Sequence, residues 1–340
     1  MLAVHRSLVI YESAMLAGMG HEVCTMYDLV GTNGAPVNPH VIGAGDHLPD
    51  SHPCRKKPVS IDGKSMESLR LLNLSLSKES MCSLSPDPRV LAAILENFDA
   101  IYVQMVPAWL LAYGVPMLRA GKKAVLRVFG HPLQELGCAY TPIRELTDVS
   151  RDPNMTLMPV LKSEIGMWSW WKGRVCPVMA AVGAEDPCGS PRSGFISVLG
   201  GGEGDLCRAF RQQAAKSCVP YKNLSYEAGF LSDEAMAKEF ESAEFYIDCY
   251  ASDTVIKYSS LEAIAHGAIS LIGPLSGQSK EMATDGVCPN SFWWDVSSPG
   301  SAIRVGLSLD KNLAKKEQSD WLSKTQASAK VLWRSILEVK

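Results

Sequence analysis

The chain has 340 residues, of which 46% are hydrophobic and 20% charged, and its formal net charge is −3. This length allows two hydrophobic cores, and the composition is that of a folded globular protein and excludes a disordered one. The slightly negative net charge excludes a general attraction to nucleic acids or anionic lipids.

Ten cysteines are spread along the chain without a CxxC pair and without Cys/His clusters at zinc-ligand spacing. This pattern favours buried, reduced thiols over a disulfide framework. The N-terminus lacks the charged-then-apolar pattern of a secretory signal. We therefore expect a cytoplasmic protein.

Residues 5–20, HRSLVIYESAMLAGMG, predict a first helix that leads into a strand at 21–29, HEVCTMYDL. A doubly wound domain normally begins with a central strand and a glycine-rich turn before its first helix. Here that first strand is missing or degenerate. Two interpretations remain open: the chain is truncated relative to its relatives, or Met1–Val4 is all that remains of the strand.

Residues 31–65 are rich in Gly, Pro, Asn and His, and this length indicates a functional or mobile insertion. We expect a helix at Ser65–Ser77 after it. Further strands are predicted for FDAIYVQMV, KKAVLRVFG and MTLMPVL, because their residues are apolar on both faces, as in strands covered by helices on each side.

The segment Ala100–Leu118, AIYVQMVPAWLLAYGVPML, imitates a membrane span, which needs about 20 apolar residues. Two prolines and a glycine interrupt it. We therefore expect a buried strand, a loop at Pro107 and a short buried helix, with no stable membrane span.

A second alternating series begins near Gly194. It predicts strands in GFISVLGGG, LSYEAGFLS, EFYIDCY and AISLIG, and helices in GDLCRAFRQQAAKS, DEAMAKEFESA and SSLEAIAHG. Alternation of short strands and longer helices is typical of parallel sheets. The linker before this series contains MWSWWKGR, whose aromatic residues either stack on a sugar or base or pack to set the interdomain hinge.

These patterns predict an α/β protein of two Rossmann-like domains that face each other across a cleft. The N-terminal domain is expected over residues 1–172 and the C-terminal domain over 173–317. The tail, residues 318–340, predicts an amphipathic helix that packs back towards the N-terminal domain.

The helix in YSSLEAIAHG has a functional pattern. Leu261, Ile264 and Ala265 form a stripe that faces the core, so Glu262 points elsewhere. Ser259 and Ser260 lie at the helix start, where free backbone N–H groups and the helix dipole favour an anion such as a diphosphate. Glu262 is then placed to accept hydrogen bonds from ribose hydroxyls. The alternative is a plain serine N-cap followed by a glutamate that the dipole favours.

The ordered series from Gly194 to Gly286 resembles the C-terminal domain of family-four retaining glycosyltransferases, which have the GT-B fold. The residues that carry the resemblance are LSYEAGFLSDEAMAKEFESAEFYIDCY and YSSLEAIAHGAISLIGPLSGQSKE. The motifs GHEV, VFGH and VGAED occupy places that such enzymes use. The resemblance implies transfer of a sugar from a nucleotide-sugar, a UDP-sugar first of all, to an acceptor hydroxyl with retention. It implies no metal and no cofactor beyond this co-substrate, and a saccharide or lipid-linked glycan as acceptor.

The resemblance also implies roles for particular residues. Glu262 binds the ribose, and Ser259 and Ser260 lie at the diphosphate. His131 points towards the sugar and the reacting centre, although a lone histidine in such a loop is otherwise structural. The expected base pocket is formed by Gly229, Phe230, Leu231 and Ser232, and Gly277 approaches the sugar or phosphate.

The sequence departs from the family pattern at three places. Thr254 stands where the first acid of the Glu-x7-Glu motif is expected, and Asp253 is the candidate that substitutes for it in catalysis. The cations that hold the diphosphate are missing after the first strand of the C-terminal domain, with Arg208 or Arg192 as possible replacements. The N-terminal glycine-rich loop is absent.

Two alternative functions remain. FDAIYVQMVPA and YIDCY resemble parts of bacteriophage α-glucosyltransferases that modify hydroxymethylcytosine in DNA, which predicts modified DNA as an acceptor. A duplex-binding face should be basic, and the net charge does not favour one. The three departures favour a degenerate GT-B protein that binds its ligand without turnover.

Overall fold

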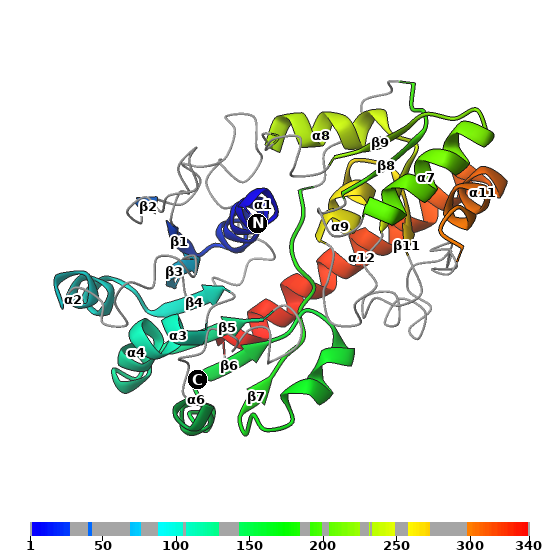
Figure 1. Cartoon of the computed structure of the whole chain (residues 1–340). Helices are drawn as coiled ribbons and strands as arrows, with labels where there is room; N and C mark the ends of the chain where they lie inside the picture. The colour runs from blue at the N-terminus through cyan, green and yellow to red at the C-terminus, as the bar shows by residue number, and fades with distance from the viewer. Residues whose placement is uncertain are drawn as a thin grey trace. The chain divides into compact units, whose positions relative to one another are not determined.

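The computed structural model describes residues 2–27, 40–42, 69–75, 88–104, 107–128, 143–183, 191–198, 204–224, 231, 233–248, 258–272 and 298–338 (Figure 1). The chain forms two compact units. The N-terminal unit contains Leu8–Ala181 and Ala329–Lys340, and the C-terminal unit contains Val182–Ser328 with Ala3–Ser7.

The N-terminal unit is built on a seven-stranded sheet of order β2-β1-β3-β4-β5-β6-β7. The pairing is parallel throughout, except that β2 is antiparallel to β1. The strands predicted around β1, β4, β5 and β6 are confirmed. The strand bounds are β1 Glu22–Tyr27, β2 His40–Ile42, β3 Arg70–Ser75, β4 Ala100–Gln104, β5 Lys123–Arg127, β6 Met155–Met158 and β7 Arg174–Val175.

The helix expected at Ser65–Ser77 is wrong, because β3 occupies its centre and pairs with both β1 and β4. Leu72 and Leu74 enter the core on one face of the sheet, whereas Leu71 enters the core on the other. The leucines favour a helix by local propensity, but two-sided strand pairing outweighs it. The helix between β3 and β4 is α2, Pro88–Asn97.

The first helix is confirmed as α1, Leu2–Gly18. Leu2, Ala3 and Val4 belong to this helix, so the interpretation of this segment as the remnant of a strand is wrong. The rest of the loop-rich region at 31–65 lies outside the described residues, apart from β2.

Helices cover both faces of the N-terminal sheet. The apolar core of one face joins the strands to the helices of the crossovers, and the core of the other joins them to α1 and the end of α12, Lys311–Glu338. The crossover elements are α2, α3 Pro107–Trp109, the π-helical turn η2 Leu110–Gly114, α4 Val115–Arg119, α6 Ile143–Val149 and the 3-10 helix η3 Lys162–Trp168.

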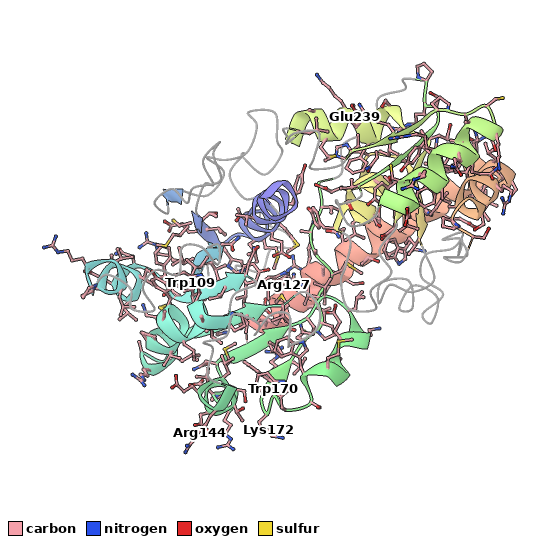
Figure 2. The ribbon with its side chains drawn as sticks, in the orientation of Figure 1. Trp109, Arg127, Arg144, Trp170, Lys172 and Glu239 are labelled. Carbon is pink, nitrogen blue, oxygen red and sulfur yellow. The ribbon has the colours of Figure 1, made fainter. Side chains whose placement is uncertain are left out.

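Two interpretations of apolar segments can now be judged. The segment 100–118 forms β4, α3, η2 and α4, as expected, and no described helix is long and apolar enough to cross a membrane. In the aromatic cluster, Trp168 and Trp171 are buried in the core of the crossover face. Trp170, which is labelled in Figure 2, packs against this core. Of the two roles considered for these tryptophans, the structure shows packing, which takes place within the N-terminal unit.

A buried ion pair fastens α1 to the sheet. Arg127, at the end of β5, pairs with Glu12 of α1, and both side chains are fully buried (Figure 2). The Tyr102 hydroxyl donates to Glu12 and accepts from Nε of Arg127 at 2.9 Å, and another guanidinium nitrogen donates to the carbonyl of Val178. Burial lowers the pKa of Arg127, but Glu12 and Tyr102 more than compensate, so the pKa is raised overall.

We expect Glu12→Ala to lower the free energy of unfolding by about 3–5 kcal/mol, because it leaves Arg127 charged and buried without its carboxylate. Denaturant unfolding measures this loss. The control is Glu22→Ala, which removes an exposed pair with Arg70 and should cost far less. Equal losses in the two variants would contradict the role of the buried pair.

The C-terminal unit has a four-stranded parallel sheet of order β11-β10-β8-β9. One core packs the sheet against α7, α11 and α12, and a second core covers the other face with α8 and α9. The bounds are β8 Phe195–Ser197, α7 Gly204–Lys216, β9 Tyr221–Asn223, α8 Asp233–Ser242, β10 Phe245–Asp248, α9 Tyr258–Ala265, β11 Ile269–Ile272 and α11 Ser301–Ser308.

The predicted elements of this half are confirmed in order, with one exception. The strand β9 ends at Asn223, just before the stretch LSYEAGFLS. Of that stretch the structure describes Leu224 and Leu231, neither of them in a strand, and the rest lies outside the described residues. At the opposite edge of the sheet, Gln318 of α12 pairs with β11. Its amide oxygen accepts from the N–H of Ser270 at 2.9 Å, and its amide nitrogen donates to the carbonyl of Ser270 at 3.0 Å.

Helix α7 ends on a residue in the left-handed conformation, Cys218, with φ +53°. The N–H of Val219 donates back to Ala214 at 3.0 Å, which completes a Schellman-type cap. This position favours glycine, because a left-handed residue with a Cβ is strained.

Cys218→Gly should therefore stabilise the protein, by up to about 1 kcal/mol. Cys207→Gly is the matched control, because the same change inside α7 should destabilise the protein: glycine is the poorer helix former, and the side chain that it removes packs against the core. Thermal unfolding of both variants gives the signs, and a loss of stability in Cys218→Gly would contradict the account of the cap.

Candidate functional site

The strand order of the C-terminal sheet changes direction at β8. From β8 it passes to β9 on one side, and it then crosses to β10 on the other side of β8. In open α/β sheets, ligands bind outside the carboxyl ends of the strands at such a switch point. The candidate site is therefore the carboxyl edge of β8 and β10, where α7 and α9 begin.

Polar side chains occupy the carboxyl ends of the central strands. Ser197, the last residue of β8, is buried and lies in register with Asn223 of β9. Its hydroxyl lies 2.7 Å from the hydroxyl of Tyr221 and 3.4 Å from Oδ1 of Asn223. These bonds fix the edge of the sheet from which the chain leaves β8 towards α7.

Two hydrogen bonds hold the start of α9 against β10. The hydroxyl of Ser259 lies 2.7 Å from that of Tyr246, and Ser260 donates to Oδ2 of Asp248 at 2.7 Å. All four side chains are buried. The serine hydroxyls therefore face the sheet, and the group that this helix start offers to an anion is its first-turn backbone N–H groups.

Glu262 has a different environment from its neighbours. It is partly exposed, whereas every other residue from Tyr258 to His266 is buried. The stripe of Leu261, Ile264 and Ala265 faces the core, as its spacing predicts. The carboxylate is thus carried on the side of α9 that the core does not use, one turn from the helix start.

Of the base-pocket residues, Leu231 is described, and it packs partly buried against the core beneath α8 and α9. The remaining predicted positions lie outside the described residues. They are His131, Gly229, Phe230, Ser232, Asp253, Thr254 and Gly277.

The structure separates the two candidate replacements for the diphosphate cations. Arg192 precedes β8, and its guanidinium donates to the carbonyls of Phe240 at 3.1 Å, Ala243 at 3.4 Å and His266 at 2.6 Å. These carbonyls end α8 and α9, where a cation is favoured by the helix dipole. Burial lowers the pKa of Arg192. Arg192 is therefore bonded at the amino edge of the sheet, whereas the diphosphate is expected at the carboxyl edge, so its proposed role at the diphosphate is wrong.

Arg208 lies at the correct edge. It belongs to the second turn of α7, which follows β8, and it pairs with Asp205 at 3.0 Å. Its side chain is 70% exposed, so it can turn towards a ligand at little cost. Among the described residues, no group of three His, Cys, Asp or Glu side chains gathers as a metal site.

The anchoring residues Tyr246 and Asp248 were missed by the sequence analysis. Their signal is the alternation in FYID, which places a hydroxyl and a carboxylate on one face of an otherwise apolar buried strand. Polar groups in such a strand need partners, and the serines of the next helix supply them.

No protein-family model and no curated protein matches the chain. Solved structures do resemble it. The OtsA apo structure aligns with a TM-score of 0.53 and 12% identity over 74% of this chain and 77% of that one. The trehalose-6-phosphate structure from E. coli bound with UDP-2-fluoro glucose aligns with a TM-score of 0.54 and 10% identity over the same shares. The UDP-forming α,α-trehalose-phosphate synthase from Burkholderia xenovorans, in complex with glucose-6-phosphate, gives a TM-score of 0.50 and 11% identity over 73% and 77%.

These neighbours are GT-B glycosyltransferases, and at this level of identity the likeness shows the fold. The predicted fold class, two Rossmann-like α/β units of the GT-B type, is confirmed.

We expect Ser260→Ala to destabilise the protein by about 1–3 kcal/mol, because it removes a buried hydrogen bond to a carboxylate. Hydrogen exchange of the α9 amides should accelerate with it. Ser242→Ala is the control, because that exposed hydroxyl donates only to a carbonyl of its own helix. Unchanged α9 protection in Ser260→Ala would contradict the anchoring role.

Proposed function

We propose that the protein is a glycosyltransferase that moves a sugar from a UDP-sugar to an acceptor hydroxyl, with retention and without a metal. The observation that carries the proposal is the start of α9, anchored at the switch point of the C-terminal sheet. The E. coli structure of the same fold holds UDP-2-fluoro glucose, which supports a uridine donor.

In this proposal the first-turn N–H groups of α9 hold the diphosphate. The adjacent carboxylate of Glu262 accepts hydrogen bonds from the ribose hydroxyls, and Gly229, Phe230 and Leu231 border the base. Helix N-termini bind phosphates through this combination of free N–H groups and dipole. The backbone supplies the contact, because the hydroxyls of Ser259 and Ser260 are bonded to β10.

The reaction balances without a further reactant. The bond between the sugar and the diphosphate breaks while the acceptor oxygen attacks on the same face, and the leaving phosphate takes the acceptor's proton. Fixed donors stabilise the developing negative charge more effectively than water does, and Arg208 is the described cation at this edge. We place His131 and Asp253 at the sugar as the catalytic candidates, with Gly277 close to the sugar or phosphate.

For the acceptor we propose a saccharide or a lipid-linked glycan. The Burkholderia xenovorans structure of the same fold holds glucose-6-phosphate, which supports a sugar acceptor. None of the structures compared above concerns DNA, so modified DNA is not carried forward. The described cysteines Cys176, Cys207 and Cys218 are free thiols, which suits the reducing cytoplasm, where we place the enzyme.

The test is a thermal-shift titration with UDP, GDP, ADP, dTDP and CMP and their sugars, followed by an assay of donor hydrolysis. A ligand at 100 times its Kd stabilises the folded state by about 2.7 kcal/mol. UDP and a UDP-sugar should give this shift, and Glu262→Ala should abolish most of it. Glu241→Ala is the control, because it removes a carboxylate beside His266 at the other end of α9.

Absence of a shift with every nucleotide would contradict the donor site. A shift with UDP-sugars but no hydrolysis or transfer would instead favour a binding protein that has lost turnover. Equal UDP affinity in Glu262→Ala and Glu241→Ala would remove Glu262 from the ribose.

A further inference from the structure

A chain of buried amides and hydroxyls runs across the α1 face of the N-terminal sheet. Gln104 donates through Nε2 to Oδ1 of Asn73 at 3.0 Å, and Asn73 donates through Nδ2 to the hydroxyl of Ser13 at 2.9 Å. Ser13 lies 3.1 Å from the hydroxyl of Thr25. None of the four residues is more than 1% exposed.

The structure places the Gln104 amide in one orientation along this hydrogen-bond chain. Asn73 directs its nitrogen to Ser13 and its oxygen to Gln104, and Gln104 directs its own nitrogen to Asn73. The amide oxygen of Gln104, Oε1, is buried and has no hydrogen-bond partner among the described residues. A buried carbonyl oxygen without a donor costs about 1–3 kcal/mol, and such groups call for an explanation.

Gln104 lies where a ligand is expected. It is the last residue of β4, the middle strand of the seven-stranded sheet, and it is in register with Arg127, the last residue of β5. Both lie at the carboxyl edge of a parallel sheet, the edge at which α/β proteins bind ligands. The amide is held rigidly there by three successive hydrogen bonds.

The surroundings select a neutral hydrogen-bond donor. The Arg127 guanidinium is bonded to Glu12, Tyr102 and the Val178 carbonyl, so its charge is balanced within the protein. A carbonyl oxygen repels an anion, and a cation would lose its hydration at this buried oxygen without gaining a carboxylate partner. A hydroxyl meets both conditions.

We infer that Oε1 of Gln104 accepts a hydrogen bond from a hydroxyl of a neutral saccharide or polyol, and that it thereby helps to select the acceptor. This inference rests on the proposed function, because it supplies that transferase with an acceptor contact. The hydrogen-bond chain to Thr25 holds the oxygen in place before the ligand arrives, so no side-chain freedom is lost on binding.

The probes are glucose, galactose, mannose and glycerol, each titrated at millimolar concentrations into the full-length protein and followed by saturation-transfer NMR. We expect at least one to bind the wild type. Gln104→Met, which has the same length but no acceptor, should bind it about tenfold more weakly. Gln104→Asn, which withdraws the oxygen but keeps an amide, should show the same loss if the methionine variant does not fold.

The control is Ser150→Ala, which removes a buried hydroxyl that donates to the Thr147 carbonyl and accepts from the Lys172 N–H and leaves the hydrogen-bond chain of Gln104 intact. It should lower the melting temperature while it keeps sugar affinity within about twofold of the wild type. Equal affinity in wild type and both Gln104 variants overturns the inference, as does an equal loss in Ser150→Ala or no binding of any probe to the wild type. UDP affinity is measured in parallel and should be unchanged in every variant, so a failure of the donor site is recognised separately.

Discussion

Parallel strands can be joined only by crossovers that run over a face of the sheet, and this constraint organises both units. In the C-terminal unit, the crossover through α7 leads to one side of β8, and the crossover through α8 leads to the other. The two crossovers must therefore lie on opposite faces, which the two separate cores confirm. The gap between the departing chains at the carboxyl ends of β8 and β10 is a consequence of strand order alone. The position of the candidate site therefore follows from topology before any particular side chain is considered.

In each unit, buried polar side chains hold a helix against the sheet, but the groups that form these bonds differ between the two units. Near the carboxyl edge of the C-terminal sheet, hydroxyls of α9 meet a tyrosine and a carboxylate of β10. In the N-terminal unit, α1 meets its sheet through an ion pair and a chain of amides and hydroxyls. Directional bonds of this kind fix the rotation and height of a helix on a sheet more narrowly than apolar packing does. A site made from helix N–H groups or a single amide oxygen depends on that accuracy.

The order of helices and strands was predictable from sequence wherever periodicity was strong. The C-terminal series and strands β1, β4, β5 and β6 follow from it. The strand β3 was not predictable, because leucine-rich RLLNLS satisfies helical and strand patterns alike and only its two neighbours in the sheet decide between them. The burial of Glu12 was missed for a related reason: its partner Arg127 is 115 positions away. Glu262 could be separated from the core stripe by spacing alone, whereas the partners of Ser259 and Ser260 required the sheet.

The pairing of Gln318 with Ser270 has a consequence beyond the anchoring of α12. The strand β11 lies at an edge of its sheet, and an exposed edge offers unpaired N–H and C=O groups to a strand of another molecule. The Gln318 amide occupies both backbone groups of Ser270, the second residue of β11, as a neighbouring strand would. Lys315 of the same helix adds an ion pair to Glu244, next to β10, at 2.6 Å. Helix α12 therefore protects this edge of the sheet from association between copies. The opposite edge is β9, which has three residues in the part of the chain that the structure describes.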